Sequence, residues 1–368
     1  MKQFLSNMIT SPATYLKEGI FLIRPSSLRA AGKTLNLCVL SMFPYATRLR
    51  HIDVQESRNG NMIVRSYTSD RNGFPLVVLH GLTQEGFSDS RLVGFCTMLA
   101  AMGFRVYTPN LQGLCMMDPQ PSDMESIRAL LNLLTIEHKN PIGLIGFSFG
   151  GTYALLAAAF PETAGAIRFV LAVGAYYSLA DVVTHTFSVR GKWNYSTEEA
   201  YALLALDWKN RTMLPLTERE VAALEELMNP ACACEMHFTP EGTTLVAKIM
   251  SLQQQEDIYQ EWKNRLPEIS SLNIENNPAL EAIEATVFLL HNEHDTFVPA
   301  EESYHIAVEL ARLHKKVLSH IGPSGEHVSF SIRNDVGLAR FFYRMMFLTE
   351  LRNTGTPERN RRRGSTAT

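Results

Sequence analysis

The sequence predicts a doubly wound α/β fold with a mostly parallel sheet, and two features of its 368 residues carry this prediction. First, short runs that are apolar at consecutive positions alternate with longer segments of helical periodicity. Strands of that kind are typical of a parallel sheet covered by helices on both faces. Second, about 100 residues of helical pattern interrupt the alternation before it resumes, which indicates an insertion into one domain.

The expected elements follow one another from residue 49. Strand-like runs at 49–54 and 62–68 flank Asn59-Gly60, a dipeptide typical of a hairpin turn. The strands expected next are 76–79, 105–107, 142–147 and 167–173, and the helices between them are 91–102, 123–137 and 149–160. After the insertion we expect a strand at 286–290, a helix at 301–313, a strand at 316–321 and a closing helix at 338–351.

These elements divide the chain into four parts. Residues 1–48 form an N-terminal extension with amphipathic helical spacing. Residues 49–177 and 280–351 form the α/β core, and residues 178–279 form a helical cap between two strands of its sheet. The basic tail, 352–368, lacks apolar residues and is expected to be disordered.

The net charge of -3 is unevenly distributed along the chain. Residues 1–50 carry +6 and the tail from Arg352 carries +4, so the segment 51–351 carries -13. An acidic body argues against nucleic-acid binding. The basic, amphipathic residues 1–45 suggest peripheral contact with the anionic inner face of a membrane, and the alternative is that they pack across the acidic body.

The compartment expected from the sequence is the cytoplasm. Five scattered cysteines, an odd number, argue against a disulfide framework and for a reducing environment. The first residues have no apolar core typical of a secretory signal. No apolar run approaches the ~20 residues of a membrane-spanning helix.

The clearest chemical feature is Gly146-Phe147-Ser148-Phe149-Gly150, a G-x-S-x-G between a buried strand and a helix. A strand that turns sharply into a helix strains the middle residue and needs small neighbours for close backbone contact. The serine hydroxyl then stands at the carboxyl edge of the sheet, at a helix N-terminus that favours developing negative charge. The pattern indicates Ser148 as a nucleophile, and the alternative is that Ser148 only caps the helix.

A serine nucleophile needs a base, and the base needs an acid that orients it. We expect His327 as the base, because it follows the last strand in a loop at the same sheet edge. His314 is expected in a helix and His320 within a strand, which makes both less suitable.

Asp295 is the expected acid, because it lies in the loop that follows the strand 286–290. Asp181 and Glu293 are the alternatives: Asp181 comes several residues after the preceding strand, and Glu293 is two positions from Asp295. With Asp295 as the acid, the chain order is serine, acid, histidine.

Four segments in this order resemble the α/β-hydrolase superfamily, over residues 49–351 apart from the insertion. His80-Gly81-Leu82 looks like the oxyanion loop, GFSFGG like the nucleophile elbow, HNEHDTFVP like the acid loop G-x-x-D-x-x-V-P, and GEH like the segment that carries the base. More narrowly, residues 81–114 and 173–183 are similar to bacterial α/β-hydrolase-fold proteins of uncharacterised substrate.

The resemblance implies an α/β-hydrolase fold and a serine hydrolase that acts on carboxylic esters through an acyl-enzyme. The backbone N–H groups of Leu82 and Phe149 would bind the oxyanion, and the partner would be a small-molecule or lipid-like ester. His291 is read as standing where the acid loop usually has glycine, a departure expected to leave the catalytic position untouched. The alternatives are an acyltransferase on the same triad and a catalytically silent binding protein.

No metal and no cofactor are expected. Cys232-Ala233-Cys234 with His237 lacks the C-x₂-C spacing of zinc sites, and buried thiols explain it better. His291 and His294 lie beside Asp295, but the acid loop already accounts for that aspartate. No phosphate-binding glycine motif opens a helix, so a nucleotide is not indicated.

Overall fold

The computed structural model describes the parts of the chain that form the predicted core. The described residues are 51–60, 62–69, 73–116, 118–138, 141–188, 217–219, 260, 263–275, 277–295, 297–323, 328 and 335–353, with only the backbone described at 186–188, 336 and 347–353. The predicted N-terminal extension, most of the predicted cap and the tail beyond 353 lie outside them, and these assignments stay predictions.

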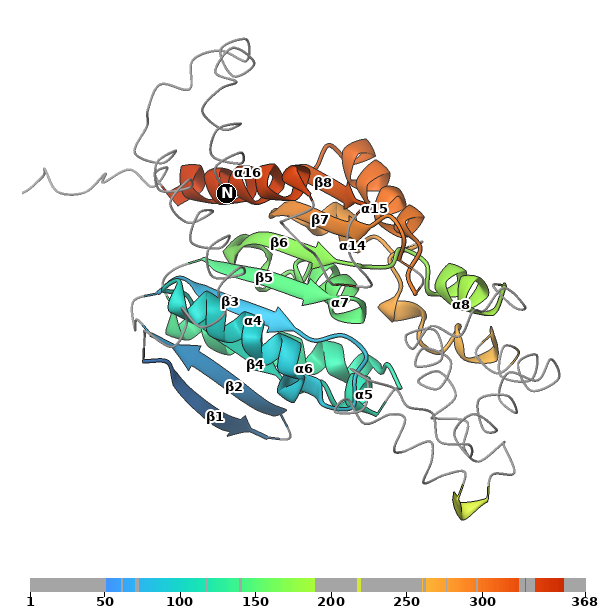
Figure 1. The fold of residues 1–368 in the computed structure, drawn as a ribbon, viewed down its shortest axis with the longest axis horizontal. Coiled ribbons are helices and arrows are strands. Elements are labelled where there is room, and N and C mark those ends of the chain that lie inside the picture. Colours follow the sequence, from blue (N-terminus) through green and yellow to red (C-terminus); the bar gives the residue numbers. More distant parts are fainter. Residues whose placement is uncertain are drawn as a thin grey trace, which may run out of the picture.

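An eight-stranded sheet forms the centre of the molecule (Figure 1), with the strand order β1-β2-β4-β3-β5-β6-β7-β8. The strands are β1 (Asp53–Asn59), β2 (Met62–Thr68), β3 (Pro75–Leu79), β4 (Arg105–Pro109), β5 (Ile142–Phe147), β6 (Ile167–Val173), β7 (Thr286–Asn292) and β8 (Val317–Gly322). β2 pairs antiparallel with β1 and with β4, and every other pair in the sheet is parallel. The predicted doubly wound, mostly parallel α/β sheet is confirmed, and β2, β5 and β6 have the predicted bounds.

Helices cover both faces of the sheet and form two separate apolar cores. One core contains side chains of α4 (Ser90–Ala101) and α16 (Val336–Asn353). The other contains side chains of α6 (Pro121–Glu137), α7 (Phe149–Ala157) and α15 (Ala300–Arg312). Figure 1 shows α4 in front of the central strands.

Shorter elements connect these helices and strands. The short helices are α5 (Gln112–Cys115), α8 (Leu179–Ser188) and α14 (Ala279–Ala282), and the 3₁₀ turns include Gly86–Ser88, Ala164–Ala166 and Ser270–Leu272. The sequence pattern did not predict α5, whose four residues are too few for a helical period to show.

The alternation of side chains within β3 explains why a central strand is apolar at every position. Leu76 and Val78 point into the core beneath α4, while Val77 and Leu79 point into the core beneath α7. All four are fully buried, and each such side chain contributes about 1.5–3 kcal/mol on leaving water. Burial on both faces therefore produces the consecutive apolar run that predicts a parallel strand.

Two local predictions were wrong. The first strand runs over Asp53–Asn59 rather than 49–54, and all its residues are exposed because it is the edge strand of the sheet. The position of this strand is set by its pairing with β2 across the turn at Gly60. Its own sequence has no hydrophobic pattern from which the strand could be predicted. His314 follows α15 in a turn with φ 55° instead of lying within that helix.

The predicted insertion leaves the sheet after β6 and returns before β7, and its two ends are bonded to each other. The hydrogen bonds run from Tyr176 Oη to Leu272 O (2.8 Å), from Leu179 N to Asn273 Oδ1 (2.9 Å) and from Ile274 N to Tyr177 O (3.1 Å). Glu302 of α15 joins the same region, because its Oε2 accepts the backbone N–H groups of Tyr177 (2.8 Å) and Ser178 (2.7 Å). The base of the insertion is thus closed and attached to the core.

No helix within the described ranges has the length and apolar character needed to cross a membrane.

Candidate active site

Ser148 lies at the turn from β5 into α7 and has an unusual backbone. Its φ of 52° and ψ of -124° fall in a region that residues with a side chain rarely adopt. Its N–H donates to Val173 O at 2.7 Å, which fixes the turn against the neighbouring strand β6. Although Ser148 occupies the N-cap position, its side chain makes no capping hydrogen bond. The hydroxyl is therefore not used as a helix cap.

The glycines on either side of Ser148 are required by close backbone contacts. A Cβ atom on Gly146 would overlap the carbonyl oxygen of Gly150. A Cβ atom on Gly150 would overlap His80 O and lie 2.7 Å from Leu79 O. The G-x-S-x-G spacing thus lets the turn close and lets α7 begin directly against the end of β3.

The segment His80-Gly81-Leu82 lies against Ser148. A Cβ atom built on Gly81 would be 3.7 Å from the Oγ atom of Ser148. Among the described residues, the N–H groups of Leu82 and Phe149 have no hydrogen-bond acceptor, and Phe149 is the first residue of α7, where no acceptor within the helix exists. Two donors on segments that meet at Ser148 are what an oxyanion site needs.

His80 holds this segment in place from a buried position. Its Nε2 accepts the Leu111 N–H at 3.0 Å, so the proton lies on Nδ1, which is 2.8 Å from Gly81 O. Burial lowers the pKa of His80 to about 4, outweighing the hydrogen bond to Gly81 and the attraction of Asp89. The ring is therefore neutral near pH 7 and connects the segment to the end of β4.

Asp295 lies in the loop between β7 and α15 and is buried. Its Oδ1 accepts the backbone N–H groups of Phe297 at 2.9 Å and Val298 at 3.0 Å. The two alternative acids differ from it: Glu293 is exposed in the same loop, and Asp181 is exposed in the first turn of α8. Of the three carboxylates, only Asp295 is held in a fixed orientation by buried donors.

His291 differs from the expectation for it. Counted back from Asp295, the glycine of G-x-x-D falls on Asn292, so His291 does not replace that glycine. It was also wrong to expect no influence on Asp295, because the Nε2 atom of His291 lies 3.3 Å from Asp295 Oδ2. This contact depends on how the loop folds back on the end of β7, and no sequence pattern indicated it.

His327, the predicted base, lies outside the described residues. It belongs by sequence to the connection between β8 and α16, and the two ends of that connection are joined by His320 Nε2 and Asp335 Oδ2 at 2.7 Å. Burial raises the pKa of Asp335, but the hydrogen bonds from His320 and from the Leu338 N–H lower it further than burial raises it. The expectation of His320 in a strand is confirmed, and its ring is engaged with Asp335.

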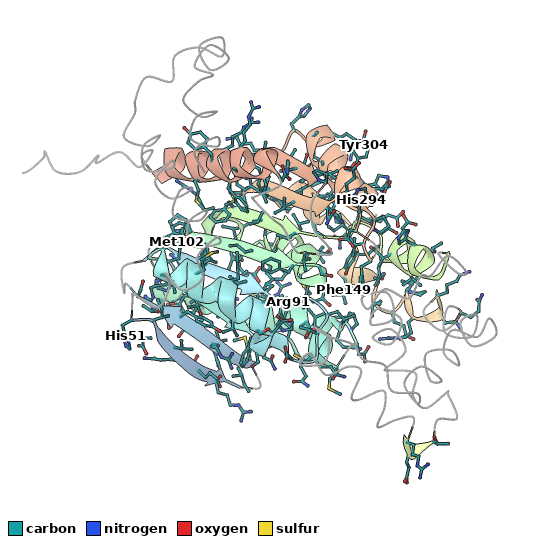
Figure 2. The ribbon with its side chains drawn as sticks, in the orientation of Figure 1. His51, Arg91, Met102, Phe149, His294 and Tyr304 are labelled. Atoms are coloured by element: carbon teal, nitrogen blue, oxygen red, sulfur yellow. The ribbon has the colours of Figure 1, made fainter. Side chains whose placement is uncertain are left out.

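The described site segments meet at one edge of the sheet. β5, β6 and β7 are neighbouring parallel strands, so Ser148 and Asp295 both follow carboxyl ends and are separated by the width of β6. Figure 2 labels Phe149 and His294, the neighbours of these residues, on the side to which the strand arrows point, and labels Met102 on the opposite side. Two strand spacings are about 10 Å, a gap that a histidine between the two side chains would bridge.

No group of three or more His, Cys, Asp or Glu side chains in the described ranges is arranged to hold a metal ion. Cys232, Cys234 and His237 lie outside those ranges.

Comparisons with known proteins agree with this fold. A model described as the alpha/beta hydrolase family matches residues 76–333. The chain is similar in structure to an acylaminoacyl peptidase of Pyrococcus horikoshii, with 13% identity, a TM-score of 0.45, and coverage of 83% of this chain and 42% of that chain. The chain thus spans about two fifths of that peptidase. No curated protein matches the chain in sequence.

Two further solved structures match over nearly their whole length. An esterase of Pyrococcus furiosus shares 14% identity with a TM-score of 0.49, and the match covers 84% of this chain and 93% of the esterase. A proline iminopeptidase of Mycobacterium smegmatis shares 14% identity with a TM-score of 0.47, covering 82% of this chain and 100% of that chain. At such identities and TM-scores, these three proteins carry no information on the substrate of this chain.

Proposed function

Because the chain belongs to the alpha/beta hydrolase family, we propose that it is a serine hydrolase that cleaves carboxylic esters with Ser148, His327 and Asp295. Membership of the family by itself indicates an enzyme with hydrolase activity. The proposal adds the nucleophile, its base and acid, and the ester class of substrate. The observation that carries it is the strained backbone of Ser148, whose hydroxyl makes no helix-capping hydrogen bond and which lies against the His80-Gly81-Leu82 segment.

The proposed reaction proceeds in two halves. His327 takes the hydroxyl proton as Ser148 Oγ attacks the ester carbonyl, and the N–H groups of Leu82 and Phe149 stabilise the oxyanion. His327 then protonates the departing alcohol, which leaves the acyl group on Ser148. Water, activated by the same histidine, releases the acid and restores the serine. Asp295 orients the imidazole and stabilises its charged form throughout.

The geometry supports this division of roles. The N–H of Phe149 opens α7, so the positive end of that helix faces the oxyanion. Leu82 would supply the second N–H, because it follows Gly81 on the segment that His80 holds against Ser148. An oxyanion donor of this kind typically contributes about 10²–10³ in rate.

The test is covalent labelling and turnover of the full chain. A fluorophosphonate probe should label Ser148, and p-nitrophenyl acetate and butyrate should be hydrolysed. Ser148→Ala should abolish labelling and lower kcat by about 10⁴ or more, because the nucleophile is lost. Asp295→Asn and His327→Ala should lower kcat by similar factors. Ser122→Ala, an exposed serine in the first turn of α6, is the matched control and should keep both activities.

Two other results would change the proposal. Folded wild-type protein that neither labels nor turns over ester would indicate a catalytically silent binding protein. Transfer of the acyl group to an added alcohol, with little free acid formed, would indicate an acyltransferase on the same three residues.

The basic residues 1–45 support a separate proposal, peripheral contact of a cytoplasmic protein with an anionic inner membrane face. These residues lie outside the described part of the chain, so the argument for it comes from charge and amphipathic spacing alone.

A further inference from the structure

A buried imidazole lies directly behind the proposed acid. His291 is near the end of β7 and is fully buried, with both ring nitrogens engaged. Nε2 is 2.8 Å from Val298 O and 3.3 Å from Asp295 Oδ2, and Nδ1 is 2.6 Å from the Oγ atom of Ser303 in α15. Strand, loop and helix therefore all contact this one ring.

The partners determine which ring nitrogen carries the hydrogen when the ring has only one. A carbonyl oxygen only accepts, so Nε2 must carry the hydrogen that faces Val298 O. Nδ1 is then an acceptor and takes the hydroxyl hydrogen of Ser303, which is itself buried. Nε2 also lies 3.3 Å from Asp295 Oδ2, so the ring that is hydrogen-bonded to Val298 O is in direct contact with the carboxylate.

The carboxylate of Asp295 is contacted at both oxygens. Phe297 and Val298 donate to Oδ1 from the backbone, and the His291 ring lies against Oδ2 with Nε2 at 3.3 Å. The two donors on Oδ1 and the buried ring beside Oδ2 together restrict the orientation of the carboxylate, and with it the direction in which the carboxylate would hold the proposed base. A buried imidazole costs free energy unless its polar atoms are paired, so an apolar residue would fill this space more cheaply if packing were its only role.

We propose that His291 is a positioning residue of the catalytic acid, and that Ser303 acts through His291 by fixing its ring. The chain of contacts then runs from Ser303, hydrogen-bonded to His291, through the contact of His291 with Asp295, and from there to the proposed base and nucleophile. This inference rests on the proposed role of Asp295 as the acid. Ser303, near the start of α15, would thus help to orient the proposed acid.

The variants that test it are His291→Leu, His291→Gln and Ser303→Ala in the full chain. His291→Leu removes the N–H and should lower kcat for p-nitrophenyl butyrate and the rate of fluorophosphonate labelling by about 10-fold, with KM unchanged. His291→Gln can again donate an N–H toward Val298 O and Asp295, and should restore most of the loss. His294→Leu is the matched control, because His294 is exposed in the same loop, and it should keep the wild-type rates.

Ser303→Ala supplies a second test that does not remove the ring. It should lower kcat by a smaller factor, about 3-fold, and the double variant His291→Leu with Ser303→Ala should be no slower than His291→Leu alone. Additive losses would mean that Ser303 does not act through His291 and would overturn that part. If circular dichroism shows that His291→Leu does not fold, the other two variants replace it as the test. In that case a lower kcat of Ser303→Ala than of wild type, with His291→Gln near the wild-type rate, supports the proposal, and a wild-type kcat of Ser303→Ala contradicts it.

Failure of the inference differs from failure of the proposed function. Wild-type protein that labels at Ser148, together with folded His291→Leu and Ser303→Ala variants at wild-type rates, would overturn the inference alone. Wild-type protein with neither labelling nor turnover would overturn both.

Discussion

At the scale of single residues, the proposed nucleophile Ser148 has a backbone conformation that serine disfavours. A residue with a side chain in such a region costs about 1–3 kcal/mol, which the surrounding structure must offset. The N–H of Ser148 bonded to Val173 O and the start of α7 immediately after it hold the turn in place. If Ser148 is the nucleophile, as proposed, stability and reactivity make opposite demands at this position.

Substitution at Ser148 should expose that conflict. Ser148→Gly and Ser148→Ala both lack the hydroxyl, and neither should be labelled by a fluorophosphonate. Glycine adopts positive φ without strain, so Ser148→Gly should be more stable than Ser148→Ala by about 1 kcal/mol in urea unfolding, even after the entropy that glycine loses on folding. Equal stability of the two variants, or a more stable alanine variant, would contradict a strained turn at this position.

Individual site residues differ in how far the sequence predicts them. The tight turn at Ser148 was predictable because it needs glycines two positions away on either side, and that requirement is local. The contact of His291 with Asp295 was missed, because it depends on the loop after β7 folding back towards α15, and sequence spacing carries no record of that. A local sequence pattern can therefore predict a strained turn such as the one at Ser148. It cannot predict that the buried ring of His291 will contact the carboxylate of Asp295.

At the scale of elements, the site depends on how closely α7 approaches the end of β3. Gly150 makes this approach possible, because its Cα faces His80 O and Leu79 O with no room for a methyl group. The same contact sets the position of the Leu82 segment relative to the Phe149 N–H. Helix packing and the placement of the two proposed oxyanion donors are therefore coupled through one glycine.

Gly150→Ala should separate α7 from the His80 segment and lower kcat by about 10² or more, since the two N–H donors would no longer converge on the oxyanion. It should also destabilise the fold by about 1–3 kcal/mol through overpacking. Gly94→Ala is the control: Gly94 lies inside α4 and a Cβ there meets nothing within 4 Å. That variant should keep full activity and gain about 0.5–1 kcal/mol in thermal unfolding. Unchanged kcat in Gly150→Ala would contradict the coupling.

Elements buried on both faces were predicted from the sequence, and the exposed edge was not. β5 and β6 have the predicted bounds because burial on two faces requires continuous apolar runs. β1 begins four residues and ends five residues later than predicted, because a polar edge strand is defined by its partner across the turn at Gly60. Pairing is a property of two segments, whereas a hydrophobic pattern is a property of one.

At the scale of the whole molecule, stability should depend on pH through Asp123. This carboxylate is buried at the start of α6, where its oxygens face the N–H groups of Gly113 (2.9 Å) and Gln120 (3.5 Å). Burial outweighs these hydrogen bonds and raises the pKa of Asp123 from 3.8 to about 6. The folded state therefore holds this proton more tightly than the unfolded chain does.

The sign of the effect follows from that difference. The contribution of Asp123 to stability is fully present below about pH 4 and is lost as the pH rises through about 6, so the unfolding free energy of wild type should fall by about 3 kcal/mol relative to Asp123→Asn between about pH 4 and pH 7. Urea unfolding of both proteins at a series of pH values measures this. If the unfolding free energy of wild type, relative to Asp123→Asn, stays constant or rises with pH, the pKa of Asp123 is not raised in the folded state.

The closed base of the insertion has a consequence for how such an enzyme can evolve. Tyr176, Leu272 and Glu302 secure the points where the chain leaves the core and returns, whatever sequence lies between them. Mutations and length changes between these points then leave the spacing of β6 and β7 unchanged. The distance between Ser148 and Asp295 depends on that spacing. Selection on the inserted residues and selection on the reacting groups can therefore act independently, and relatives with the same turn at Ser148 can diverge in what they accept.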